Sequence, residues 1–302
     1  MHDRYSWSPF SFVFLFTYKD NGFPAIFFTS SKLYHTICRM NQYFDMKKLF
    51  LLFSIAITIL LLFPMALMAQ QTHVLEPSIM EVAYHEISGK YNDDYALRVG
   101  KSMSQYFSYH KLRDDSLSSN AQTSMIILQE MLDEANNRND ASKQRASGPD
   151  HGDYFYRSQA NNTFDTYTSF MGQGYKITEP IPVQDWNIVT DSTRQILGYN
   201  CCMATTTFRG RQWTVYYTED IPVPLGPWKL GGLPGLILFA EVKGFITIEA
   251  SGIKTKSTSP VTFYNFLNKK YEAIQRDVYI KEKSNPKAYP KNTIVIPQME
   301  LQ

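Results

Sequence analysis

The stretch that decides the fold of this chain reads GPWKLGGLPGLIL, residues 226–238. Its second half runs on into a short apolar segment, 236–242, which is typical of a strand buried on both faces. Pro234 pushes Leu233 out of the α region, and the following Gly235 suits the positive-φ position of a type II turn. We therefore expect a turn that leads directly into a buried strand.

The segment before this turn, residues 219–232, contains three prolines and three glycines and favours neither helix nor strand. A connection of that length inside a compact domain is usually functional or disordered. Apolar side chains along it argue against disorder; they are Ile221, Val223, Leu225, Trp228 and Leu230. We expect an ordered loop that folds back onto the sheet, anchored by Trp228 and Leu233, with its glycines serving backbone geometry.

Residues 232–237 spell GLPGLI, and other short motifs precede this string in a fixed order. These motifs are Ile196-Leu197-Gly198-Tyr199-Asn200-Cys201 with Ala204, Gly210-Arg211, Tyr216-Tyr217-Thr218, Ile221-Pro222 and Gly226-Pro227-Trp228. With them the chain resembles the GLPGLI family of exported bacterial proteins, and weaker matches at 106–108 and 185–186 extend the resemblance over most of the chain after residue 80. The resemblance implies export, but the family has no established molecular function. Its signature loop here comprises Gly226, Pro227, Trp228, Gly232, Leu233, Pro234, Gly235, Leu236 and Ile237.

The N-terminal region has the pattern of a leader peptide that begins inside the chain. Met46-Lys47-Lys48 opens it, an apolar run follows at 49–63, and small residues end at Ala69. We interpret 46–69 as a signal peptide cleaved near Ala69, 1–45 as a non-native upstream extension, and 70–302 as a single domain. The alternative is a genuine N-terminal extension with a transmembrane anchor at 49–69, which is long enough to span a bilayer.

Charge excludes one class of partner. Residues 1–69 hold 6 of the 30 Lys and Arg residues and 3 of the 28 Asp and Glu residues, which leaves 24 basic against 25 acidic residues in the remainder. A nearly neutral chain lacks the basic footprint of a nucleic-acid-binding protein. After cleavage of the signal peptide no membrane span is expected either.

Two adjacent cysteines, Cys201 and Cys202, remain in the expected mature chain. Neighbouring Cα atoms are ~3.8 Å apart, so a disulfide between them would be strained. On a strand the two side chains point to opposite faces. We interpret one as a core residue and the other as an incidental thiol, with a metal or redox pair as the alternative.

Most of the chain after residue 80 has the alternation and turn spacing of an antiparallel sheet. We expect strands at 81–87 and 95–99 joined by a turn at Asp93-Asp94, and further strands from 154 to 250. Two helices are expected, one at 116–135 with Ser116 as its N-cap and one at 260–282 after Ser259, and a final strand at 293–296. The predicted class is mainly β (α+β): an antiparallel meander curved into a sandwich or half-barrel, with the two helices packed on it.

Recognisable catalytic motifs are absent from the sequence. It has no nucleophile elbow, no zinc-protease helix, no phosphate loop and no dinucleotide fingerprint, so we expect no cofactor and no metal. His151 and Asp153 lie in a polar stretch that we interpret as a solvated linker, 136–152 with its flank. Arg209 and Arg211 flank Gly210; we interpret them as a solvated hairpin turn, with an anion clasp as the alternative.

These observations favour an exported, non-enzymatic binding protein. Its ligand would be an unknown envelope protein or an apolar molecule, bound at a surface that includes Trp213, Tyr217, Arg211 and Trp228. The alternatives are an envelope hydrolase whose site matches no known motif and a purely structural envelope component. Charged groups converging on a cavity, with perturbed pKa values, would favour the hydrolase.

Overall fold

The structure of this chain is a computed structural model, and it describes residues 72–137, 147–290 and 297–301. All of these lie in the second of two compact units, Ala69–Gln302. The expected upstream extension, the signal peptide and the end strand at 293–296 fall outside the described residues. Within the described ranges no helix combines the length and the hydropathy needed to cross a membrane.

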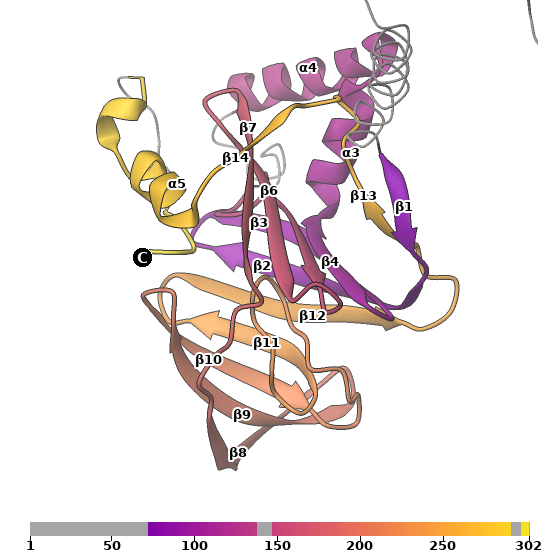
Figure 1. Ribbon diagram of the computed structural model, residues 1–302, viewed down its shortest axis with the longest axis vertical. Coiled ribbons are helices and arrows are strands. Elements are labelled where there is room, and N and C mark those ends of the chain that lie inside the picture. The colour runs from indigo at the N-terminus through magenta and orange to yellow at the C-terminus, as the bar shows by residue number, and fades with distance from the viewer. Residues whose placement is uncertain (1–71, 138–146, 291–296, 302) are drawn as a thin grey trace, which may run out of the picture. The chain divides into compact units, whose positions relative to one another are not determined.

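One large twelve-stranded sheet dominates the fold (Figure 1). Its order is β14-β7-β6-β5-β4-β3-β2-β12-β11-β10-β9-β8. The strands of its first half are β2 Ser78–Ser88, β3 Tyr91–Gly100, β4 Met103–Ser108, β5 Tyr154–Ser158, β6 Thr163–Phe170 and β7 Gln173–Pro180. Those of its second half are β8 Asn187–Ile196, β9 Tyr199–Phe208, β10 Arg211–Thr218, β11 Leu236–Val242 and β12 Ile246–Lys254, with β14 Tyr271–Ala273 added at one edge.

Within each half, consecutive strands pair antiparallel. Short turns join most of them, whereas α3 and α4 lie between β4 and β5 and the signature loop lies between β10 and β11. The halves are joined where β12 pairs with β2, far apart in sequence. In Figure 1 the strands around β6 and β7 stand steeply, whereas β9, β10 and β11 lie across the view, so the sheet is bent between them. The mainly β class and the antiparallel meander are thereby confirmed, in an open sheet whose one parallel pair among the described strands is β14 with β7.

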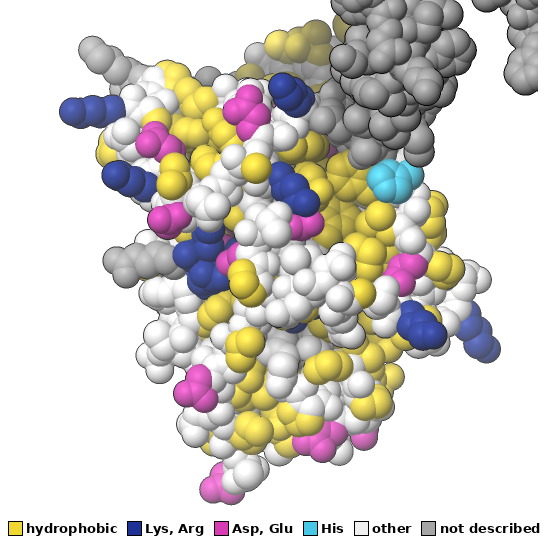
Figure 2. All heavy atoms as spheres, in the orientation of Figure 1, with side chains coloured by type: hydrophobic (Ala, Val, Ile, Leu, Met, Phe, Trp, Pro, Cys, Tyr) yellow, Lys and Arg dark blue, Asp and Glu magenta, His cyan; other side chains and the backbone are white. Residues whose placement is uncertain are grey.

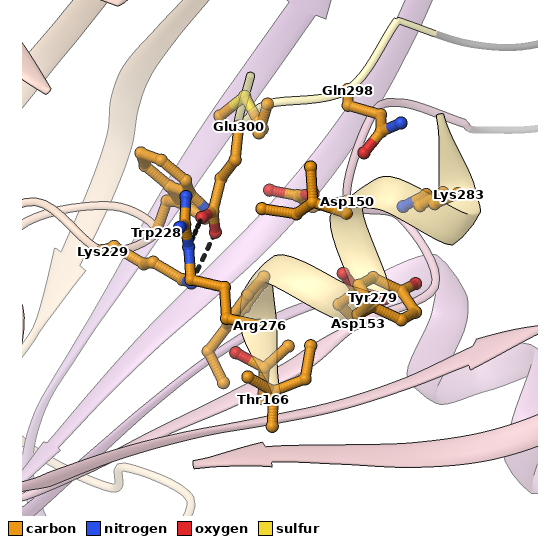
Figure 3. Close-up of a pocket in the computed structure, with 14 residues that line it drawn as sticks. Asp150, Asp153, Thr166, Trp228, Lys229, Arg276, Tyr279, Lys283, Gln298 and Glu300 are labelled. Carbon is orange, nitrogen blue, oxygen red and sulfur yellow. Dashed lines mark hydrogen bonds and ion pairs between the residues drawn. The ribbon is translucent and has the colours of Figure 1, made fainter. Parts of the chain in front are cut away.

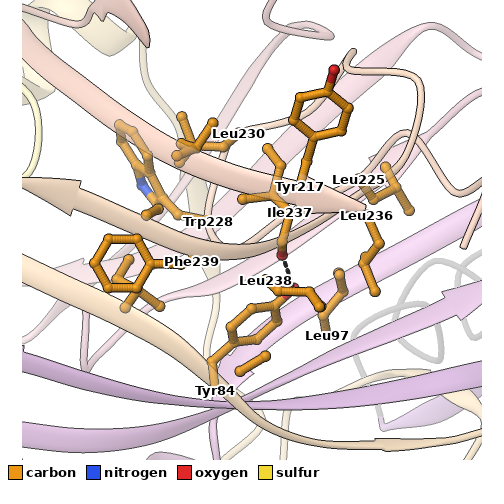
Figure 4. Close-up of a cluster of buried hydrophobic side chains, with 14 of the residues drawn as sticks. Tyr84, Leu97, Tyr217, Leu225, Trp228, Leu230, Leu236, Ile237, Leu238 and Phe239 are labelled. Carbon is orange, nitrogen blue, oxygen red and sulfur yellow. Dashed lines mark hydrogen bonds between the residues drawn. The ribbon is translucent and has the colours of Figure 1, made fainter. Parts of the chain in front are cut away.

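The main hydrophobic core surrounds β11, the strand into which the signature loop leads. Every residue of β11 except Glu241 is buried, which confirms the strand predicted at 236–242. Figure 4 shows the apolar side chains that gather around it from the loop, β10 and β3. Buried Tyr84 of β2 donates a hydrogen bond to the carbonyl oxygen of Ile237 over 2.7 Å, so its polar tip is satisfied inside this core.

The first predicted helix is correct in existence but divided in two. The chain forms α3, Tyr109–Ser118, and α4, Ala121–Asn136. Ser116 lies inside α3, and the N-cap of α4 is Asn120, whose side chain accepts a hydrogen bond from Gln122 N. α3 lies against β3 and β4, and α4 packs against α3. The apolar face of α4 is not part of the sheet core, since Met125 and Leu132 are 60% and 50% exposed.

The second predicted helix, 260–282, is wrong for most of its length. The chain there forms β13, Val261–Phe263, which pairs with β1, His73–Glu76, then β14, and only then α5, Arg276–Lys283, with a 3₁₀ turn at Pro286–Ala288. The apolar residues do recur at helical spacing, but open sheet edges compete for the backbone. Asn265 also closes a local loop, because its side chain accepts a hydrogen bond from Lys269 N and donates one to Lys269 O.

The turn expected at Asp93-Asp94 is displaced as well. β2 and β3 are longer than predicted and meet at Gly89, whose φ of 60° makes it the turn residue. Asp93 therefore lies within β3, where its residue is only 1% exposed. Asp93 was expected in an exposed turn, but because it lies in a strand its carboxylate is buried.

Candidate functional site

The signature loop is ordered by backbone hydrogen bonds to itself and to the start of β11. Leu236 N donates to Ile221 O and Ile237 N donates to Leu225 O, each over 3.0 Å, and a bridge joins Leu225 to Gly231. Trp228 and Leu233 are 3% and 2% exposed, as expected for anchors. The loop therefore folds back onto the sheet, as its apolar residues predicted.

Trp228 is the most constrained residue of this loop. Its φ is 54°, a conformation that bulky residues rarely adopt and that persists only where the surroundings enforce it. Its ring stacks on Trp213 at 5.5 Å and meets Phe208 edge-on at 5.7 Å. The positive φ expected at Gly235 is wrong, since Gly232 has it instead, at 83°. Gly235 is needed for another reason, because a Cβ there would lie 1.9 Å from the carbonyl oxygen of Thr218.

Lys229, the residue after Trp228, is the centre of a buried network of charges. Its side chain is 3% exposed, and its Nζ lies 2.5 Å from Glu179 Oε1 and 2.5 Å from Glu300 Oε1. Arg209 pairs with Glu179, and Arg276 pairs with Glu300. The network therefore joins the loop, β7, the β9–β10 turn, α5 and the segment 297–301. A buried lysine is tolerated here because two carboxylates neutralise it.

A small pocket adjoins this network, lined by Trp228 and Lys229 of the loop, by α5 and by residues 298–300 (Figure 3). Its volume is about 30 Å³, room for one or two water molecules. Asp150 Oδ2 and Thr166 Oγ1 are buried in its wall, and neither atom has a hydrogen-bond partner among the described residues. Two unpaired acceptors in one small pocket favour a polar occupant.

Two aspartates in this pocket have perturbed ionisation. Burial, and then the charge of Asp153, raise the pKa of Asp150 well above its ordinary value. Burial likewise raises the pKa of Asp153, although Lys283 opposes it. For Lys283 burial lowers the pKa, but the charge of Asp153 and its neighbours outweighs burial and the net shift is upward. Burial therefore makes both carboxyl groups of the pocket resist ionisation, and the positive charge of Lys283 opposes this effect at each of them.

A neighbouring group resembles a catalytic triad in composition only. Ser108 Oγ donates to Asp93 Oδ1 over 2.9 Å, and His151 Nδ1 lies 2.6 Å from Asp93 Oδ2. In a triad the serine and the carboxylate contact different ring nitrogens, whereas here Nδ1 faces both, at 3.4 Å from Ser108 Oγ. Ser108 also caps α3 by accepting from Lys111 N. We interpret the group as a clasp that fixes the loop 147–153 onto β3.

The interpretation of His151 and Asp153 as solvated linker is therefore wrong. Asp150 and Asp153 are each 8% exposed. The reason lies one step further along the chain, because all five residues of β5 are buried and the loop must follow the strand into the interior. The signal that the sequence analysis missed was the aromatic run Tyr154-Phe155-Tyr156 directly after this polar stretch.

The surface expected from Trp213, Tyr217, Arg211 and Trp228 is divided by the structure. Trp213 and Tyr217 lie in the core, at 0% and 2% exposure, because they alternate inward along β10. Trp228 reaches the pocket wall. Arg211 lies outside the core: its Nε donates to Met299 O over 2.8 Å, and its guanidinium also donates to Gln298 O. Arg209 and Arg211 are thus not a solvated turn but hold another part of the chain.

Lys229, Arg276, Lys283 and Glu300 are the site residues that the sequence did not reveal. A lone lysine inside an apolar, Gly-rich loop was the available signal for Lys229, since a buried lysine requires an acidic partner. The others lie in the stretch mistaken for a long helix or after it. Their ion-pair partners are distant in sequence, so the spacing of residues along the chain does not indicate these pairs.

Other candidate sites offer less chemistry. Cys201 is buried and Cys202 half-buried, both are free thiols, and burial raises the pKa of Cys201 to about 11. In the part of the chain that the structure describes, no three His, Cys, Asp or Glu side chains converge on a metal position. A second hollow of about 150 Å³ lies between the β3–β4 turn and residues 222–225 of the loop, with mostly apolar walls. On the face in Figure 2, acidic and basic side chains are interspersed.

Comparisons with known proteins place the chain in a family. Two solved structures of PNGF-II, in space groups C2 and P2₁, resemble it with TM-scores of 0.43 and 0.44 and identities of 18% and 17%. Each likeness covers 70% of this chain, which spans about a third of the length of those chains, 32% and 33%. No curated protein matches the chain. Residues 107–279, more than half of the chain, match the family described as "N-glycanase peptide, N-terminal domain". The chain belongs to the family of this N-glycanase N-terminal domain.

Proposed function

We propose that the chain is an exported, non-enzymatic binding protein that holds a segment of a glycoprotein. The observation that carries the proposal is the way residues 298–301 are bound. Four cationic side chains and a buried tryptophan surround this segment, which bends at Met299 and belongs to no helix or strand. Such a surface is built to receive polypeptide. The glycoprotein part of the proposal rests on the name of the family, that of an N-glycanase domain.

Export is the second part of the proposal. The basic start at Met46-Lys47-Lys48, the apolar run and the small residues up to Ala69 support cleavage near that position. The GLPGLI string and its accompanying motifs support membership of that exported family in addition. Both lead to a periplasmic or extracellular protein.

A hydrolase is the second candidate, favoured by Asp150 and Asp153. Two carboxyl groups with different surroundings are the usual source of an acid and a base in one site. Limited access argues against a hydrolase: both aspartates are nearly buried, and the volume of the pocket is only about 30 Å³. A substrate could reach them only if residues 298–300 moved away.

One experiment tests binding and hydrolysis together. The full chain is immobilised, and a purified model N-glycoprotein is passed over it before and after enzymatic removal of its glycans. We expect saturable binding of the intact glycoprotein with its mass unchanged by mass spectrometry. Loss of glycan or peptide mass would identify a hydrolase, and the Asp150→Asn variant would then abolish that loss. Absence of binding by both forms would refute the binding function.

A further inference from the structure

The backbone of residues 298–301 is held in a way that does not depend on its side chains. The guanidinium of Arg211 donates to two successive carbonyl oxygens, those of Gln298 and Met299. Leu301 N donates to Arg209 O over 3.1 Å. Gly210 allows this approach, since a Cβ there would lie 2.9 Å from Leu301 Cβ. These contacts go to backbone atoms of the segment, so they do not depend on which side chains the segment carries.

Two side chains of the segment, those of Met299 and Glu300, make specific contacts with the surrounding residues. Met299 is 2% exposed, belongs to the main hydrophobic core and lines the pocket together with Trp228. Glu300 lies between Lys229, Arg276 and Arg209, with Arg209 Nε at 3.7 Å. We call the surface made by Arg209, Arg211, Trp228, Lys229 and Arg276 the cradle. It accepts an apolar residue followed by an acidic one.

The charge of the cradle requires the acidic residue. Glu300 pairs with both Lys229 and Arg276, so its loss would remove a negative charge from a nearly buried group of cations. Burial alone would raise the pKa of Glu300, but Lys229, Arg276 and Arg209 outweigh it and lower the pKa below its ordinary value. A site that lowers the pKa of its occupant binds the carboxylate form.

We propose that the cradle is a recognition site for a short peptide segment of a partner protein with an apolar residue followed by Glu or Asp, and that residues 298–301 are the chain's own competing occupant. This inference rests on the proposed binding function and specifies its ligand. A tethered occupant competes at an effective concentration on the order of millimolar. A partner segment therefore binds weakly to the intact chain and more tightly once the internal occupant is weakened.

A labelled, capped peptide of residues 297–301, PQMEL, is the probe, and fluorescence anisotropy is the readout. We expect the full-length Glu300→Gln variant to bind it at least tenfold more tightly than the parent chain. The peptide PQMQL should lose most of this binding, since it cannot neutralise Lys229 and Arg276. Glu272→Gln is the matched control: it removes one negative charge from an exposed position of β14 and should bind like the parent.

Three outcomes would overturn the proposal. The first is a folded Glu300→Gln variant, with the circular dichroism of the parent, that does not bind PQMEL at millimolar concentration. The second is a dimer by native mass spectrometry that PQMEL dissociates, because the natural occupant would then be a second copy. If Glu300→Gln does not fold, hydrogen exchange of the parent decides instead. Exchange of the Leu301 amide only through global unfolding would show that the cradle never opens.

The peptide experiment and the glycoprotein experiment fail in different ways. Binding of the intact glycoprotein without any binding of PQMEL would leave the binding function standing and remove only its assignment to the cradle. Failure of both would remove the function itself. Competition of PQMEL against the bound glycoprotein would place both at the same surface.

Discussion

At the scale of single residues, the glycines of the signature loop show that close approach and positive φ are separate demands. Gly235 has an ordinary φ but no room for a side chain, whereas Gly232 has room and a φ of 83°. At Gly235 an added side chain would collide with the backbone of Thr218, and neither backbone can move aside. The second costs only the local strain of the left-handed conformation.

We therefore predict that Gly235→Ala destabilises the fold more than Gly232→Ala. The first change forces a methyl group against the Thr218 carbonyl and should lower the free energy of unfolding by roughly 3 kcal/mol. The second should cost about 1–2 kcal/mol. Urea denaturation measures both. Gly252→Ala is the control, with open space and no positive φ, and should leave the midpoint unchanged. Equal effects of all three would contradict the steric argument.

Asp150 provides a prediction on pH. Its pKa is raised by burial and by Asp153 above the ordinary value of 3.8, so above pH 4 the folded state binds more protons than the unfolded state. The stability contributed by this residue therefore falls as pH rises. Asp150→Asn should be progressively more stable than the parent between pH 4 and pH 7, by urea midpoints. Asp185→Asn, at an exposed position, is the control variant. A stability difference between Asp150→Asn and the parent that does not change with pH would refute the shift.

The sequence predicted the residues that serve packing better than those that serve charge. Trp228 and Leu233 could be recognised as anchors, because a large apolar side chain in a Gly- and Pro-rich loop has few alternatives to burial. Lys229 and Glu300 could not be paired in advance, because 71 positions separate them and charge pairs follow no periodicity. Asp150 was hidden for the opposite reason, since short polar residues are usually solvated.

At the scale of elements, strands with a buried neighbour on each side were the most predictable. β11 begins and ends where its apolar run does. The region 260–282 was misread because amphipathic spacing alone does not decide between a helix and short edge strands that complete a sheet. Only the open edges at β1 and β7, which no local pattern shows, explain why β13 and β14 form.

The segment 297–301 is held in part by the charge of Glu300, which pairs with Lys229 and Arg276. Glu300→Gln removes the carboxylate that pairs with buried Lys229 and with Arg276, and should lower the free energy of unfolding at pH 7 by roughly 3 kcal/mol. The folded pKa of Glu300 lies below its ordinary value of 4.5, so its contribution is present above that pH and is lost as pH falls through the folded pKa. The deficit of the variant should therefore shrink as pH falls below 4.5. A deficit that stays unchanged from pH 7 down to the lowest pH at which the parent remains folded would indicate lost packing rather than lost charge. Exposed Glu272→Gln serves as control.

At the scale of the whole molecule, the antiparallel meander could be predicted from the sequence, but the pairing of β12 with β2 that joins its two halves could not. Short turns force most consecutive strands together, but β4 and β5 pair across the two helices α3 and α4, and β10 and β11 pair across the signature loop. The pairing of β12 with β2 joins residues about 160 positions apart, and it depends on burial of both strands rather than on any turn. That junction brings the signature loop beside β5 and β7, where Arg157 donates to Lys229 O and Glu179 pairs with the Lys229 side chain.

The N-terminal pattern predicts which part of the chain remains after export. An n-region at 46–48, an apolar run and a small-residue end at Ala69 predict a mature chain that starts at or near Gln70. The domain described by the structure begins shortly after, since β1 starts at His73, so cleavage there removes none of the strands described. N-terminal sequencing of the protein from its native cell decides the matter. Recovery of Phe12 or Phe27 in the mature chain would refute cleavage and favour the anchored alternative.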